Sequence, residues 1–306
     1  MILIILLYFL CAATFPLAKA TLALAHPFFY VGIRMTIAGL LLLSVYRFFK
    51  GPLPPMKRLS RHSGQRSDVS LFLQVALFSI YCAYMLDLWS LQYLTSIESA
   101  FIFNLSPFMA ALFSYLWFAE MMTATKWIGL GLGSASVLPL LFARNGELVA
   151  VSTEQIVPIV ALICSVAASA YGWIVMRELV KNRDYAPLVV NGYAMLIGGL
   201  ATLLTSYGVE SWSPSPVVDW PKFALYTGAM IIIANGIFSN LYSYLLKHYT
   251  ATLLSFSGFL CPIFACLLGY FCLQEPLSGK FFFSLVCIIS GLFLFYQEEL
   301  RQGYVE

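Results

Sequence analysis

The sequence predicts an all-α polytopic membrane protein, with ten transmembrane helices arranged as two inverted five-helix repeats. Three observations carry this prediction: the composition, ten apolar runs and an internal repeat. Of 306 residues, 61% are apolar and 10% are charged, whereas an ordinary soluble domain has roughly 25% charged residues. So few charges cannot cover a soluble protein of this length, and lipid must therefore solvate most of its surface.

The expected spans are apolar runs close to the length that crosses a bilayer, which is about 20 residues. Open strands are excluded because their unpaired backbone groups are too costly in hydrocarbon, and a barrel would show strict alternation that these runs lack. The spans are Ile2–Lys19, Phe28–Phe49, Leu71–Leu91, Ile97–Phe118, Trp127–Phe142, Ile156–Met176, Leu188–Tyr207, Phe223–Leu246, Ala251–Leu273 and Phe281–Tyr296.

Lysine and arginine residues set the expected orientation, because they accumulate in cytoplasmic loops. If the N-terminus is inside, most loop cations lie on the inner side. The inner loops hold Arg47, Lys50, Lys57, Arg58, Arg61, Arg66, Lys126, Arg177, Lys181, Arg183, Lys247 and Arg301, and the outer loops hold Arg144, Lys222 and Lys280. We therefore expect both termini in the cytoplasm, and the short loops favour the cell inner membrane.

An internal repeat divides the chain into residues 1–150 and 151–306. Its clearest segments are "LSPFMAALFSYLWFAE" and "LCPIFACLLGYFCLQE", which place Pro107 against Pro262 and Glu120 against Glu275. Each half holds five spans, and because five is odd the second half must insert upside down. Inverted repeats are typical of secondary transporters, whose substrate site lies at the repeat interface near the bilayer midplane.

Further segments resemble the drug/metabolite transporter superfamily in its ten-helix EamA branch. They include "HPFFYVGIRMTIAGLLLL", "ASAYGWIVMREL" and "LLSFSGFLCPIFACLLGYFCLQEPLSG". The resemblance implies a basket of helices around a central cavity, with the fifth and tenth helices peripheral, and alternating access without an ATPase. The sequence agrees, because it has no GxxxxGK[ST] phosphate loop. The family's usual Gly-Glu at the ends of the fourth and ninth helices is here Ala119-Glu120 and Gln274-Glu275.

Ionisable residues inside spans are costly and suggest function. Tyr81, Tyr84 and Asp87 step by three and share a broad helical face that can hold a cationic group. The alternative is that Asp87 reaches interfacial water. Lys19 and Arg34 can each bind a carboxylate. Their alternatives are snorkelling for Lys19 and, since it resembles the family's usual arginine, a structural partner role for Arg34.

Polar and aromatic residues complete the expected substrate site, although each can instead pair or pack between helices. They are Asn104, Tyr171, Trp173, Asn235, Tyr242 and Ser255. Pro107 and Pro262 are expected mid-helix, as hinges or as tolerated kinks, and would free the carbonyls of Phe103 and Gly258. Glu120 and Glu275 either cap turns or form protonatable coupling sites.

No metal or cofactor is expected. The seven cysteines lie in apolar runs without a CxxC, and the sequence has three histidines, so a zinc ligand set is missing. The net charge of +3 does not suggest nucleic acid. Gly129 and Gly133 form a GxxxG that indicates close helix packing or, alternatively, a homodimer seam.

The leading function is therefore a secondary transporter, such as an antiporter, of a small zwitterionic metabolite with an aromatic or nucleoside part. The resembling family includes amino acid exporters and S-adenosylmethionine transporters of intracellular bacteria. A nucleotide-sugar carrier is the alternative, although its phosphates should require more intramembrane Lys and Arg. A membrane-embedded enzyme is disfavoured by the scattered histidines and the lack of an aspartate pair.

Overall fold

The structure, a computed structural model, describes residues 2–54, 67–94, 99, 102–141, 156–213, 215–264, 267 and 279–304. In these ranges the chain is almost entirely helical, and its extended pairing is an isolated antiparallel bridge between Ala25 and Val217. The helices are α1 (Ile2–Leu22), α2 (Pro27–Lys50), α3 (Asp68–Gln74), η1 (Val75–Cys82), α4 (Ala83–Ser90), α6 (Ser106–Phe118), α7 (Ala124–Leu141), α8 (Ile156–Arg177), η3 (Glu178–Asn182), α9 (Pro187–Val209), α10 (Trp220–Met230), η4 (Ile231–Phe238), α11 (Ser239–Leu245), α12 (Ala251–Ser257) and α14 (Gly279–Arg301).

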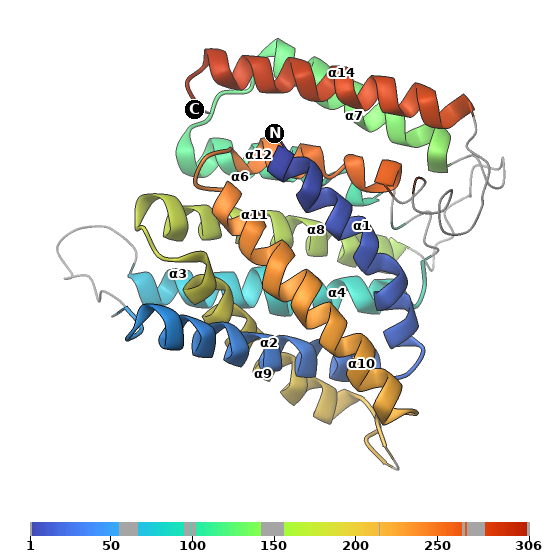
Figure 1. The fold of residues 1–306 in the computed structure, drawn as a ribbon. Helices are drawn as coiled ribbons and strands as arrows, with labels where there is room; N and C mark the ends of the chain where they lie inside the picture. The colour runs from blue at the N-terminus through green and yellow to red at the C-terminus, as the bar shows by residue number, and fades with distance from the viewer. Residues whose placement is uncertain are drawn as a thin grey trace.

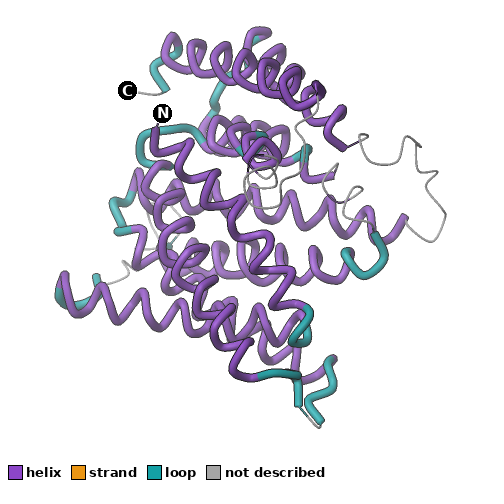
Figure 2. Tube along the Cα trace, turned by 45° about the vertical axis from the view of Figure 1, so that its right-hand side comes forward, coloured by secondary structure: helices purple, strands orange, loops and turns teal. Residues whose placement is uncertain are grey.

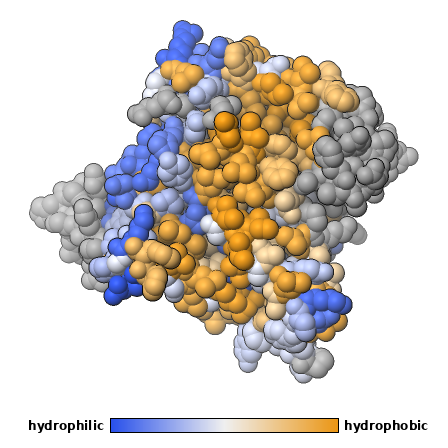
Figure 3. All heavy atoms as spheres, in the orientation of Figure 1, coloured by the Kyte–Doolittle hydropathy of each residue, from blue (hydrophilic) through white to orange (hydrophobic). Residues whose placement is uncertain are grey.

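Each of the ten expected spans contains a helix. Five helices are long and apolar enough to cross a membrane: Pro27–Lys50, Asp68–Ser90, Ile156–Asn182, Pro187–Val209 and Trp220–Leu245. Shorter apolar helices cover Ile2–Thr14, Ser106–Phe118 and Ala251–Phe264. Large apolar side chains such as Leu204, Leu225 and Ile232 are exposed, and the visible face of the bundle is broadly hydrophobic (Figure 3). The prediction of a polytopic α-helical membrane protein is confirmed.

Two of the long helices widen into π-helical segments at related positions. η1 interrupts the α3–α4 helix and η4 interrupts the α10–α11 helix; each spans 8 residues, and their first residues, Val75 and Ile231, are 156 apart. The π-helix is rare and often occurs at functional sites. The two segments therefore fall at matching places in the third and eighth expected spans.

Close helix pairs form opposite edges of the bundle, with α2 and α9 at one edge and α7 and α14 at the other (Figure 1 and Figure 2). A Cβ on Gly39 would lie 2.5 Å from the backbone nitrogen of Leu196, and a Cβ on Gly199 would lie 2.6 Å from that of Thr36. On the other edge, a Cβ on Gly129 would lie 2.9 Å from the carbonyl oxygen of Gly291. Glycine thus lets both pairs bring their backbones together.

Both glycines of the predicted GxxxG are covered by the same chain. Gly129 meets α14, and a Cβ on Gly133 would lie 2.1 Å from the Phe256 ring. This contact favours the packing interpretation of the motif over a dimer seam.

The structure does not place Pro107 and Pro262 in the middle of a helix, where the sequence predicted them. A turn at residues 104–105 interrupts the fourth span just before α6, and Pro107 is the second residue of that helix. A turn at residues 258–259 likewise ends α12, and Pro262 lies in the short helical stretch that resumes afterwards. Proline suits the first turn of a helix because its missing N–H is not needed there. The Gly258 carbonyl is not free, since the Cys261 N–H donates to it at 2.9 Å.

Candidate functional site

Several polar and aromatic side chains, from helices that are distant in sequence, lie in or against the same hydrophobic core. We call this group the central cluster. Its members are Tyr8 of α1, Tyr30 and Arg34 of α2, Tyr84 and Asp87 of α4, Trp173 of α8, Asn235 of η4 and Tyr242 of α11. Six of these eight residues were predicted from the sequence as substrate-site or structural residues.

Arg34 is a buried cation without an acidic partner in the described part of the chain. Its side chain is 5% exposed, and Nη1 donates to the Tyr30 hydroxyl at 3.0 Å. The guanidinium carbon lies 5.0 Å from the Tyr30 ring centre and 5.5 Å from the Tyr84 ring centre. Nε is buried and has no hydrogen-bond partner there. The two rings stabilise the charge by cation–π attraction, but the Nε–H group is left without an acceptor.

Asp87 and Asn235 add unsatisfied acceptors. Asp87 Oδ1 is buried without a hydrogen bond, and so is Asn235 Oδ1, among the residues that the structure describes. Asn235 is 2% exposed, and its Nδ2 contacts the sulfurs of Met35 at 3.1 Å and Met195 at 3.6 Å. Buried polar atoms normally have partners, so each exception requires an explanation.

Aromatic rings of α8, α11 and α1 belong to the same core. The ring centres of Trp173 and Tyr242 are 4.1 Å apart at an interplanar angle of 34°. The Tyr8 hydroxyl donates to the Leu254 carbonyl and joins α1 to α12. These rings form flat apolar surfaces on which a planar heterocycle can stack.

Other predicted site residues lie elsewhere. Tyr171 donates to Gln74 at 2.6 Å and packs against Trp117, because it is two residues from Trp173 and faces another side of α8. Tyr81 bonds Thr205 of α9 at 2.9 Å.

Four further predictions have these outcomes. Ser255 bonds Ser106 at 2.8 Å, and half-buried Asn104 lies in the turn before α6. The Lys19 side chain and Glu275 lie outside the described residues.

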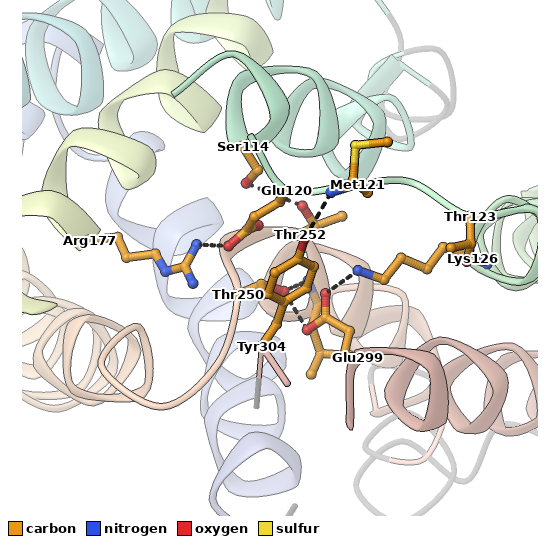
Figure 4. Close-up of polar contacts among 11 residues, drawn as sticks. Ser114, Glu120, Met121, Thr123, Lys126, Arg177, Thr250, Thr252, Glu299 and Tyr304 are labelled. Carbon is orange, nitrogen blue, oxygen red and sulfur yellow. Dashed lines mark hydrogen bonds and ion pairs between the residues drawn. The ribbon is translucent and has the colours of Figure 1, made fainter. Parts of the chain in front are cut away.

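At one end of the bundle, charges are buried in pairs (Figure 4). Lys126 Nζ contacts Glu299 Oε1 at 3.0 Å, with side-chain exposures of 2% and 1%. Glu299 Oε2 accepts a hydrogen bond from the Thr250 hydroxyl at 2.6 Å, and Thr250 also caps α12 by accepting from the Leu253 N–H at 3.1 Å. These contacts join α7, α12 and α14, and we call this region the ion-pair end.

A second buried pair lies beside the first. Arg177, at the end of α8, contacts Glu120 in the linker between α6 and α7. The Arg177 guanidinium carbon also lies 4.8 Å from the Phe118 ring centre, and the Tyr304 hydroxyl accepts from the Met121 N–H at 3.1 Å. Glu120 therefore holds the linker to α8, whereas the sequence had suggested turn capping or coupling.

The sequence analysis assigned Lys126 and Arg177 to inner loops, whereas the structure places them in the first turn of α7 and at the end of α8, and both are buried. Their carboxylate partners lie far along the chain, so no local spacing could indicate the pairing. A more exposed ion pair lies at the same end. Lys247 lies 2.8 Å from Asp184, and its ammonium holds the pKa of that carboxyl below its usual range.

A groove of about 620 Å³ opens between α3, α6 and η3. Its lining is Leu71, Leu116, Trp117, Phe118, Glu178, Asn182 and Arg183. It does not include the central cluster, and Leu116 is 68% exposed on its rim. In the described residues, no group of three or more His, Cys, Asp or Glu side chains is placed to hold a metal.

Comparison with known proteins decides the family. The model of the EamA-like transporter family matches residues 1–142 and 156–297. This chain belongs to the EamA-like transporter family. It is therefore a multi-pass membrane transporter with a small-molecule substrate, and the family assignment points away from an enzyme.

Individual relatives are similar over nearly the whole chain. The S-adenosylmethionine/S-adenosylhomocysteine transporter of Chlamydia muridarum is 34% identical over 299 residues, covering 97% of this chain and 91% of that protein. The protein of the same name from Chlamydia trachomatis serovar D is 33% identical over 302 residues, covering 97% and 89%. A solved crystal structure shares the fold, with a TM-score of 0.77 at 20% identity, covering 98% of this chain and 97% of that one.

Proposed function

We propose that this EamA-like transporter carries S-adenosylmethionine and S-adenosylhomocysteine by secondary, alternating-access transport. The observation that carries the proposal is the 33–34% identity to transporters of that name along 97% of the chain. These ligands combine an adenine ring with an amino acid, and the first also has a positively charged sulfonium.

The central cluster offers matching chemistry. Arg34 can bind a carboxylate, and Asp87 can bind a cation. The rings of Trp173 and Tyr242 offer faces on which adenine can stack. The two rings pack against each other at a tilt of 34°, so a ligand that stacks between them would have to separate them.

Alternating access also needs two ends that can open. Buried charge pairs join helices at the ion-pair end, and elsewhere Glu210 joins the end of α9 to the start of α2, because its carboxylate accepts the Phe28 and Phe29 N–H groups at 2.8 Å each. The family match in two parts and the spacing of η1 and η4 support the inverted repeat of residues 1–150 and 151–306. The cytoplasmic termini rest on the loop charges, and the inner-membrane location rests on the short loops and the family.

A nucleotide-sugar carrier is the less favoured alternative. Its diphosphate would need several cations, and among described core residues the other buried cations, Lys126 and Arg177, are already paired at the ion-pair end.

Counterflow in proteoliposomes tests the proposal. Vesicles containing the full chain and excess unlabelled S-adenosylmethionine should accumulate the labelled compound, and internal S-adenosylhomocysteine should substitute. Protein-free vesicles and vesicles loaded with a nucleotide sugar are the controls. Accumulation driven by the nucleotide sugar alone would favour the alternative carrier, and the absence of exchange with correctly folded protein would contradict the proposed substrates.

A further inference from the structure

The two unpaired charges of the central cluster lie on neighbouring helices and flank one aromatic ring. Tyr84 is one turn before Asp87 on α4, and its ring centre is 5.5 Å from the Arg34 guanidinium. α2 and α4 are in contact, yet no ion pair joins Arg34 to Asp87 in the described structure. Isolated buried charges are costly, and a protein that keeps two of opposite sign without pairing them loses stability.

The free part of Arg34 suits a carboxylate. Nη1 is occupied by Tyr30, while Nε is buried with no acceptor. The guanidinium presents Nε and a neighbouring nitrogen in a planar fork that matches two carboxylate oxygens. A ligand carboxylate would neutralise this charge and satisfy Nε at the same time.

The surroundings of Asp87 suit a cation that donates no hydrogen bonds. An ammonium has three donors to satisfy, and the nearby backbone acceptors already have side-chain donors: Ser165 donates to the Ala83 carbonyl at 2.7 Å and Ser90 to the Leu86 carbonyl at 2.6 Å. Among the described residues of the central cluster, Asp87 Oδ1 and Asn235 Oδ1 are the acceptors left without a hydrogen bond, fewer than the three that an ammonium needs, and the Tyr84 ring lies one turn before Asp87. An anion beside an aromatic face attracts an onium group by charge and cation–π interaction.

We infer that Arg34 binds the ligand carboxylate and that Asp87 binds the sulfonium, so that Asp87 distinguishes S-adenosylmethionine from S-adenosylhomocysteine. The inference rests on the proposed function and adds the basis of its selectivity. The two ligands differ at this sulfur: one carries a methyl group and a positive charge, and the other is a neutral thioether.

Competition binding with the purified full chain tests this inference, using each ligand labelled in its adenine ring. Asp87→Asn should weaken binding of S-adenosylmethionine by about tenfold or more, as expected for loss of a charged contact, and change S-adenosylhomocysteine binding little. Arg34→Gln should weaken both ligands and spare 5′-methylthioadenosine, which lacks the amino acid.

Asp68→Asn is the matched control, because Asp68 starts the same long helix but is paired with Arg183 and accepts from the Tyr185 hydroxyl at 2.6 Å. It should leave the affinity ratio unchanged. Asp87→Glu keeps the charge and should keep a preference for S-adenosylmethionine, which guards against misfolding of the Asn variant. Equal weakening of both ligands in Asp87→Asn would overturn the inference alone. Wild-type protein that binds neither ligand would overturn the proposed function.

Discussion

At the ion-pair end, Lys126 and Glu299 are withdrawn from solvent and lie 3.0 Å apart. In the central cluster, Arg34 is 5% exposed and Asp87 Oδ1 is buried, but neither has an opposite charge within reach among the described residues. Pairing recovers much of the cost of burying a charge, whereas an unpaired charge lowers the stability of the fold. The first region therefore holds helices together, and we propose that the second is kept for a ligand.

Breaking a pair at the ion-pair end should give the largest effect. Glu299→Gln leaves the buried Lys126 ammonium without its countercharge, which should lower the free energy of unfolding by about 3–5 kcal/mol. Thermal unfolding in detergent, followed by tryptophan fluorescence, measures the change. Adding Lys126→Met to this variant should restore much of the stability. A double variant as unstable as Glu299→Gln would show that the pair is not the cause.

Asp87→Asn should change stability in the opposite direction. Removing this unpaired, half-buried charge should raise the free energy of unfolding by about 1 kcal/mol, while transport of the cationic ligand falls. The same unfolding assay compares it with Asp68→Asn, which loses a paired carboxylate on the same helix and should be destabilised. A loss of stability in Asp87→Asn as large as in Asp68→Asn would contradict the distinction between the regions.

A smaller effect is expected beside the ion-pair end, where Ala119 follows α6 with a φ of 52°. This left-handed conformation favours glycine, which is the usual residue at this position in the family. Ala119→Gly should therefore stabilise the protein by about 0.5–1 kcal/mol. The matched change Ala224→Gly, at an exposed position in α10, should destabilise it by about 1 kcal/mol. Shifts of the same sign would refute the conformational explanation.

The smallest effect should come from an exposed pair at the same end. Asp184 is 89% exposed and contacts Lys247, so solvent screens the attraction. Asp184→Asn also suits the φ of 53° at this residue, because asparagine tolerates the left-handed region. We expect no resolvable change in unfolding temperature. A clear decrease in unfolding temperature would show that this exposed pair does contribute to the stability of the fold.

Periodicity and composition were sufficient to predict the helices, because a span must satisfy its own backbone and its apolar surface in lipid. They also led to Asp87, Arg34, Asn235 and Tyr242, since polar groups stand out in apolar runs. Tyr8 was missed because a tyrosine in a long apolar run carries no distinguishing pattern.

The breaks in the fourth and ninth spans could not be predicted, since a proline fits either a kinked helix or the first turn of a new one. The buried pairs were hidden for another reason. Lys126 and Glu299 are separated by 173 residues, and a sequence does not show which loop charges the packing will bury.

The glycine contacts at the two edges of the bundle restrict how this protein can move. Where Gly39 and Gly199 bring the α2 and α9 backbones together, the helices have no layer of side chains that can repack, so sliding one past the other would produce a collision. The same holds for α7 and α14 at Gly129 and Gly291. We expect each helix pair to move as a rigid body, with the conformational change of the transport cycle confined to the helices between the two pairs.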